Sequence, residues 1–143
     1  MKLNPYLNFA GNAEEAFGFY KSVLGGEFSS LVRFKDLPMA GVKIPEEDQS
    51  KIMHIALPVG QGDLLMASDA LASLGQSLVP GNNVYLSLHP ASREEADRIF
   101  NALAAGGAVD MPIADQPWGD YYGSLIDRFG IRWMVNYSHP AAK

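Results

Sequence analysis

Two segments of the chain repeat apolar residues at the three- and four-residue spacing of an amphipathic helix. The apolar positions are Ala13, Ala16, Phe17, Tyr20 and Leu24 in the first segment, and Ala96, Ile99, Phe100 and Leu103 in the second. A pair of glycines, Gly25-Gly26 and then Gly106-Gly107, follows each segment, as is common where helices end. The pattern predicts helices over about residues 13–24 and 92–105.

Both predicted helices begin with the same arrangement of residue types. Asn12 and Ser92 are residue types that cap a helix N-terminus, and a glutamate follows each of them three residues later, at Glu15 and Glu95. Ser92 and Glu95 fit the capping box, in which side chains satisfy free backbone N–H groups reciprocally, and Asn12 with Glu15 is a looser version. The shared cap, apolar face and glycine end indicate an internal repeat.

Short runs rich in β-branched and aromatic residues surround each helix and predict strands. The runs are 6–10, 28–34, 52–59 and 64–68 in the first half, and 84–88, 109–113, 121–126 and 131–137 in the second. Turn sequences at 60–63 and 127–130 join the last two strands of each half into a hairpin. Each half therefore has the order βαβββ.

This repeated order predicts an α+β fold built from two units, residues 3–69 and 82–138. Neither unit covers its own sheet alone, so we expect the two to pack as a single domain over residues 1–143. The segments 38–50 and 70–82 are rich in Pro, Gly and Ser and are predicted to be irregular.

The composition excludes several classes of protein and site. Of the 143 residues, 48% are hydrophobic and 19% charged, which is typical of a globular chain. A net charge of −5 argues against nucleic-acid binding through a basic face, and the lack of cysteine excludes disulfides, thiolate metal sites and a cysteine nucleophile. No apolar run approaches the ~20 residues of a membrane helix, and no signal peptide is visible. We expect a cytoplasmic protein with neither nucleic-acid nor membrane partners.

Several sequence blocks match a known family. They are Phe9-Ala10-Gly11-Asn12-Ala13-Glu14-Glu15-Ala16 with Phe19-Tyr20, then His54 and Leu65-Met66-Ala67-Ser68-Asp69, and finally Asp127-Arg128-Phe129-Gly130-Ile131-Arg132-Trp133. Together with the repeat, they resemble the PhnB-like branch of the vicinal oxygen chelate superfamily, also called the glyoxalase/bleomycin resistance/dioxygenase superfamily. The resemblance covers residues 3–138. It implies a U-shaped mixed sheet around a small-molecule cavity, helices on the outer face, and a homodimer.

Metal-dependent members of this superfamily bind a divalent ion through residues of the first, fourth, fifth and eighth strands. The resemblance places those positions near Pro5, Met66, Val84 and Met134 in this chain. Proline and valine side chains have no donor atom, and a thioether suits Cu(I) rather than the divalent ions of the superfamily. We therefore expect no metal and no other cofactor.

Residues of suitable chemistry at strand positions are candidates for the ligand pocket. They are Asn8, His54, Met66, Ser68, Asp69, Trp118, Tyr121, Tyr122, Met134 and Asn136. His54 is either a cavity hydrogen-bonding group or proton acceptor, or a satisfied half-buried side chain. Asp69 either orients a ligand or caps the following turn. The aromatic stretch 118–122 is either a pocket wall or a rim or dimer contact, Trp133 is expected in the core, and the other two histidines are expected to be exposed.

The activity stays open at this point. We favour a metal-free, small-molecule-binding protein, either a binder or an enzyme of unknown substrate. A divalent-metal-dependent lyase, isomerase or dioxygenase is one alternative, and an antibiotic-sequestering resistance protein is another. We assign no catalytic residue, because nucleophile-elbow and phosphate-loop motifs are absent and paired carboxylates occur only in helix first turns or a loop.

Overall fold

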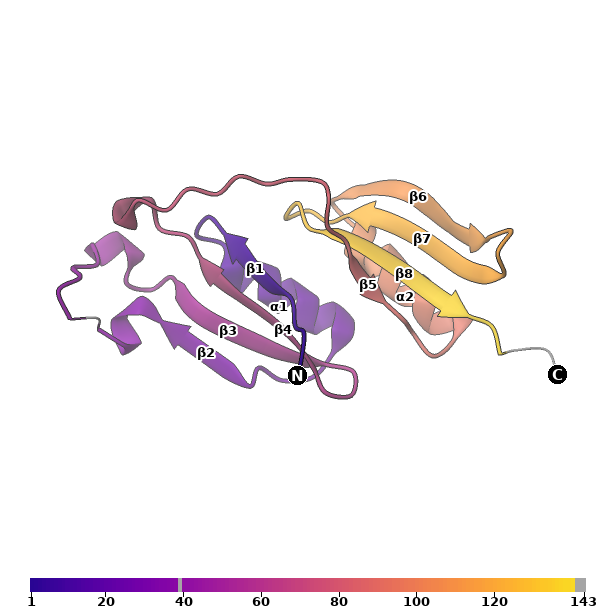
Figure 1. Ribbon diagram of the computed structural model, residues 1–143, viewed down its shortest axis with the longest axis horizontal. Coiled ribbons are helices and arrows are strands. Elements are labelled where there is room, and N and C mark those ends of the chain that lie inside the picture. The colour runs from indigo at the N-terminus through magenta and orange to yellow at the C-terminus, as the bar shows by residue number, and fades with distance from the viewer. Residues whose placement is uncertain (39, 141–143) are drawn as a thin grey trace. The chain divides into compact units, whose positions relative to one another are not determined.

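The computed structural model describes residues 1–38 and 40–140, which form two compact units, Met1–Val79 and Pro80–Lys143. Each unit is a four-stranded mixed sheet with one helix against one face (Figure 1). The α+β class and the tandem βαβββ order are therefore confirmed. The single domain stays a prediction, and each unit is described here by itself.

The first unit has the strand order β1-β4-β3-β2. Its elements are β1 (Tyr6–Phe9), α1 (Ala13–Leu24), β2 (Ser30–Arg33), β3 (Ile52–Val59) and β4 (Asp63–Asp69), with short 3-10 helices η1 (Phe34–Asp36), η2 (Glu46–Asp48) and η3 (Ala72–Leu74). Strands β1 and β4 pair in parallel, and the other pairs are antiparallel. This parallel pairing brings Asn8 beside Ser68, although the two residues lie far apart in the sequence.

The second unit repeats this topology in the order β5-β8-β7-β6. Its elements are β5 (Leu86–Leu88), α2 (Arg93–Ala104), β6 (Ala108–Asp115), β7 (Asp120–Ile126) and β8 (Arg132–Ser138). Again only the first and last strands of the unit pair in parallel. Strand β5 begins later than predicted and β6 extends beyond its predicted range at both ends, whereas the two hairpin turns lie where the sequence predicts them.

The core of each unit lies between the helix and one face of its sheet. Helix α2 buries the four apolar residues that the periodicity predicts. Helix α1 buries Val23 in place of the predicted Leu24, which is half-exposed because the helix ends there. Trp133 is 1% exposed, which confirms it as a core residue. We call the opposite face of each sheet, which carries no helix, the open face.

The two helices are capped differently. Ser92 Oγ accepts a hydrogen bond from the Glu95 N–H (3.1 Å), as predicted, but the reciprocal bond of the capping box does not form, since Glu95 Oε1 accepts from the Ala91 N–H (3.3 Å). The prediction for Asn12 is wrong, since its side chain makes no capping bond. The carboxylate of Asp69, at the end of β4, takes its place and accepts from the N–H groups of Gly11 and Ala13 (both 3.0 Å). Tertiary structure therefore supplies the cap that the local sequence assigns to Asn12.

In the part of the chain that the structure describes, no helix is long and apolar enough to cross a membrane.

Candidate functional site

The open face of the first unit carries a polar pair where edge strand β1 meets β4. Asn8 of β1 and Ser68 of β4 are register partners, and Ser68 Oγ donates a hydrogen bond to Asn8 Oδ1 (3.3 Å). Alternation along β4 explains the placement, because Leu65 and Ala67 are buried against the helix while Met66 and Ser68 are half-exposed on the other side. The amide nitrogen of Asn8 remains available for a ligand on this face.

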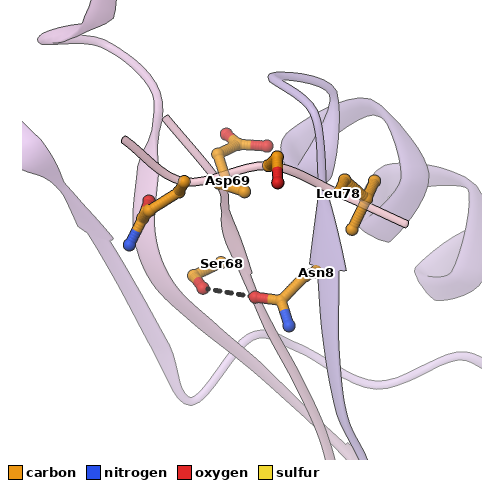
Figure 2. A pocket seen from close by; sticks show the side chains of 7 residues that line it. Asn8, Ser68, Asp69 and Leu78 are labelled. Atoms are coloured by element: carbon orange, nitrogen blue, oxygen red, sulfur yellow. Dashed lines mark hydrogen bonds between the residues drawn. The ribbon is translucent and has the colours of Figure 1, made fainter. Parts of the chain in front are cut away.

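Asn8 and Ser68 line a pocket of about 310 Å³. Its walls are Asn8, Ser68, Asp69, Ala70, Gln76, Ser77 and Leu78 (Figure 2). The segment after β4 forms one wall, and a reciprocal pair of bonds holds it: the Leu71 N–H donates to Gln76 Oε1 (2.8 Å) and the Gln76 N–H to the Leu71 carbonyl (3.1 Å). Buried Leu71 anchors this turn in the core. The pocket is thus a polar site with one ordered loop wall.

His54 of β3 lies on the same open face beside Tyr6 of β1. The Tyr6 hydroxyl lies 3.0 Å from His54 Nδ1, and the two rings stack with centroids 5.6 Å apart. Whether the phenol or the imidazole donates in this bond depends on the His54 tautomer. His54 is therefore a partnered, half-buried side chain on this face.

Asp69 lines the pocket, but its carboxylate is engaged by backbone groups. One oxygen accepts from Gly11 and Ala13, and the other accepts from the Ile52 N–H (2.8 Å). The side chain is 3% exposed. It ties the start of α1 and the start of β3 to the end of β4, so its main role is structural, though not in the turn after β4 that the sequence suggests.

Met66 and Met134 occupy equivalent positions in the two units. Met66 lies between Tyr6 and Ala56 in the sheet register, and Met134 lies between Ser87 and Ser124. The interval along the chain from Ala56 to Met66 equals the interval from Ser124 to Met134, which supports the internal repeat.

The open face of the second unit gathers three of the predicted residues around Met134. Tyr122 and Asn136 are register partners. Asn136 Nδ2 donates to Asp120 Oδ2 (3.2 Å) and to Ser138 Oγ (3.3 Å), which gives this strand asparagine its partners. The Trp118 ring packs edge-on against Tyr122 at 5.8 Å, although Trp118 is 62% exposed. This end of the face is aromatic and largely accessible.

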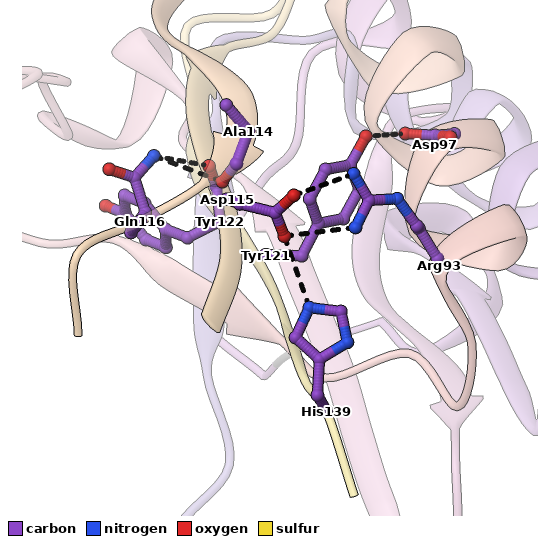
Figure 3. A network of polar contacts seen from close by, with 8 residues as sticks. All are labelled: Arg93, Asp97, Ala114, Asp115, Gln116, Tyr121, Tyr122 and His139. Carbon is purple, nitrogen blue, oxygen red and sulfur yellow. Dashed lines mark hydrogen bonds and ion pairs between the residues drawn. The ribbon is translucent and has the colours of Figure 1, made fainter. Parts of the chain in front are cut away.

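Tyr121 lies on the other side of the sheet, against α2. Its hydroxyl donates to Asp97 Oδ1 (2.5 Å), and the Arg93 guanidinium lies 3.9 Å above its ring (Figure 3). Arg93 also makes two hydrogen bonds to Asp115 (both 3.0 Å), which His139 approaches at 3.2 Å. Neighbouring strand residues point to opposite faces, so Tyr121 and Tyr122 do not share a pocket.

This network shifts two ionisation equilibria. The hydrogen bond to Asp97 and burial raise the pKa of Tyr121. The hydrogen bonds from Arg93 and then His139 lower the pKa of Asp115. His139 is exposed and His89 lies at the end of its strand with an accessible ring that approaches Ser87 Oγ at 3.2 Å.

Comparison with known proteins identifies the family. The family model described as 3-demethylubiquinone-9 3-methyltransferase matches residues 1–136. The chain belongs to this family. With the structural relative described as a PhnB protein, this confirms the PhnB-like assignment, and structures described as glyoxalase-related share the fold.

Individual relatives of this PhnB-like protein cover nearly its whole length. Protein YjdN of Escherichia coli is 32% identical over 146 residues, covering 95% of each chain. The crystal structure of PA1353 from Pseudomonas aeruginosa has a TM-score of 0.85 at 40% identity, covering 96% of this chain and 98% of that one. A Bacillus cereus structure described as a putative 3-demethylubiquinone-9 3-methyltransferase, PhnB protein, has a TM-score of 0.71 at 27% identity, covering 96% of this chain and 100% of that one.

The donor groups of the PhnB-like chain do not fit a divalent cation at the superfamily position. The register places Tyr6 and Ser87, rather than the predicted Pro5 and Val84, opposite the two methionines. In each unit, a hydroxyl group and a thioether are a poor ligand pair for a divalent ion that prefers carboxylate or imidazole. Among the described residues, no group of three or more His, Cys, Asp or Glu side chains could hold a metal.

Several residues that the sequence analysis passed over belong to the open faces. In the first unit they are Tyr6, Gln76 and Ser77; in the second they are Tyr85, Ser87, Asp110, Ser124 and Arg132. The positions of Tyr6 and Ser87 could have been predicted from strand alternation, which places Tyr6 on the same face as Asn8, and Ser87 on the same face as His89. Gln76 and Ser77 lie in a loop, where no periodicity indicates which way a side chain points.

Proposed function

We propose that this PhnB-like protein binds a small polar molecule on the open face of its first unit, without a divalent cation. The pocket lined by Asn8, Ser68 and Ser77 is the observation that carries the proposal. Its volume, about 310 Å³, lies at the lower end of the range for small-molecule sites, which is about 300–1,000 Å³.

The chemistry of the walls supports a polar ligand. Asn8 Nδ2 and the hydroxyls of Ser68 and Ser77 offer donors and acceptors, and Leu78 adds an apolar contact. Beyond them on the same face lie the Met66 thioether and the Tyr6–His54 pair. A few polar groups beside apolar surface is the usual composition of a small-molecule site.

A fragment screen by ligand-observed NMR tests the proposal, with a library of small, uncharged polar molecules. We expect hits whose binding to the Asn8→Ala/Ser68→Ala double variant is weaker by about tenfold or more, because each lost hydrogen bond removes about 0.5–1.5 kcal/mol. Asn101→Ala is the matched control, since Asn101 is exposed on α2. Hits that bind the double variant and the wild type equally would place the ligand elsewhere.

We also propose a cytoplasmic homodimer, an assembly common in the superfamily. Large apolar side chains on the edge strand β6 support an interface, since Val109 and Met111 are 49% and 42% exposed. Sedimentation equilibrium should give twice the chain mass of 15.5 kDa. A sharp monomer mass at micromolar concentration would contradict the dimer.

A further inference from the structure

Arg132 places a positive charge on the open face of the second unit. It is the first residue of β8 and is the register partner of Ile126 on β7. Because Met134 corresponds to Met66 in the repeat, Arg132 corresponds to Leu64 of the first unit. The repeat therefore has an apolar residue in one half and a guanidinium in the other.

The Arg132 guanidinium has unused hydrogen-bonding capacity. Its Nε is buried and has no hydrogen-bond partner in residues 1–38 and 40–140. Buried donors are nearly always paired, and an arginine carries five N–H donors in a planar fork. Because Nε itself is buried, an incoming acceptor would meet the terminal Nη groups of this half-exposed side chain, which carry the other N–H donors.

The groups around Arg132 are held in place by bonds to one another. The Tyr85 ring lies 5.9 Å from the guanidinium carbon, and the Tyr85 hydroxyl donates to Asp110 Oδ2 (2.6 Å). Ser124 Oγ donates to the same oxygen (3.1 Å). These two hydroxyls, with a further contribution from the charge of Arg132, lower the pKa of Asp110, so its carboxylate is ionised at neutral pH. Asp110 is bonded by hydroxyls, which leaves the guanidinium fork for another acceptor.

We propose that the open face of the second unit holds an oxyanion site, in which Arg132 binds the carboxylate or phosphoryl group of a small molecule beside the Tyr85 ring. A planar fork matches both oxyanions in a bidentate geometry. The nearby Asp110 carboxylate repels anions, so we expect weak binding that disfavours extended polyanions most. The site lies in the second unit, so it does not depend on the pocket lined by Asn8 and Ser68.

NMR titration with simple anions tests the site directly. Inorganic phosphate and sodium acetate are the probes, with sodium chloride at matched ionic strength as the blank. The reporter is the Arg132 Nε–H resonance, assigned by its loss in Arg132→Gln. We expect a saturable shift with a dissociation constant on the order of 1 mM, and the tighter of the two probes identifies the class of oxyanion.

Two variants of Arg132 and one control variant distinguish specific binding by its guanidinium from non-specific attraction of anions to positive charge. Arg132→Gln should abolish the saturable response of neighbouring amides, and Arg132→Lys, which keeps the charge but not the fork, should weaken it about three- to tenfold. Arg98→Gln removes the same charge from exposed Arg98 on α2 and should bind as the wild type does. A response that does not saturate, that survives Arg132→Gln, or that falls equally in Arg98→Gln overturns the proposal. Fragment binding at the first unit should be unchanged in Arg132→Gln, so the two proposals fail separately.

Discussion

Replacing Asp69 with alanine should destabilise the protein strongly. The carboxylate is 3% exposed and accepts three backbone N–H groups, those of Gly11, Ala13 and Ile52, at 2.8–3.0 Å. Loss of a helix N-cap removes about 0.5–2 kcal/mol. The buried Ile52 N–H left without an acceptor adds about 1–3 kcal/mol. We therefore expect the free energy of unfolding to fall by about 1.5–5 kcal/mol, a large part of the stability of an ordinary domain.

Urea unfolding followed by two probes measures this loss and shows how far it spreads. Far-UV circular dichroism reports both helices, whereas both tryptophans, Trp118 and Trp133, lie in the second unit. If the chain is a single cooperative domain, Asp69→Ala should lower the midpoint of both signals equally. If the units unfold separately, tryptophan fluorescence should keep its wild-type midpoint.

The matched control is Asp63→Ala, at the exposed start of the same strand, which should change the free energy of unfolding by less than about 0.5 kcal/mol. A loss below about 1 kcal/mol in Asp69→Ala, with an unchanged denaturant slope, would refute the assignment of Asp69 as the tie between α1, β3 and β4.

Further predictions concern two glycines and two ionisable groups. Gly18→Ala, in α1 with open space around the new methyl group, should raise the free energy of unfolding by about 0.5–1 kcal/mol. Gly107→Ala should lower the melting temperature or prevent folding, because its Cβ would overlap the Ile126 carbonyl oxygen; wild-type stability would contradict the close approach. The raised pKa of Tyr121 means that the folded state holds this proton more tightly than the unfolded state. Its contribution to the free energy of unfolding is therefore lost as the pH rises above the unfolded pKa of about 10. Tyr121→Phe should flatten the alkaline limb of a stability–pH curve. The lowered pKa of Asp115 acts in the opposite direction: its contribution to the free energy of unfolding is present above the unfolded pKa of about 3.9 and is lost as the pH falls. Asp115→Asn should therefore flatten the acid limb of the stability–pH curve. An unchanged alkaline limb in Tyr121→Phe, or an unchanged acid limb in Asp115→Asn, would refute the corresponding assignment.

The fold can be predicted from the sequence because its local sequence patterns all indicate the same order of helices and strands. The apolar face of α2, the paired glycines after each helix and the two hairpin turns all specify the same βαβββ order. The errors arise where tertiary contacts replace local ones. Asn12 has the chemistry and position of a cap, but the Asp69 carboxylate at the end of β4 makes the bonds.

The candidate site can be predicted from the sequence only in part. Asn8 and Ser68 are predicted as separate strand residues, and the parallel pairing of β1 with β4, which sequence periodicity cannot show, brings them together. The sequence-based prediction treats the aromatic stretch as one surface, whereas strand alternation divides it between two faces and places Tyr121 against α2. Arg132 lies between two apolar residues in the sequence, and only its unpaired buried Nε distinguishes it from other surface arginines.

The methyl NMR spectrum of protein labelled at its six methionines tests the central claim most directly, because Met66 and Met134 lie on the open faces. We predict that the tightest fragment from the screen shifts the Met66 methyl resonance saturably, and that one equivalent of paramagnetic Mn²⁺ broadens neither methionine selectively. Selective broadening of Met66 and Met134 by Mn²⁺, or a bound fragment that leaves Met66 unmoved, would contradict a metal-free ligand site on this face.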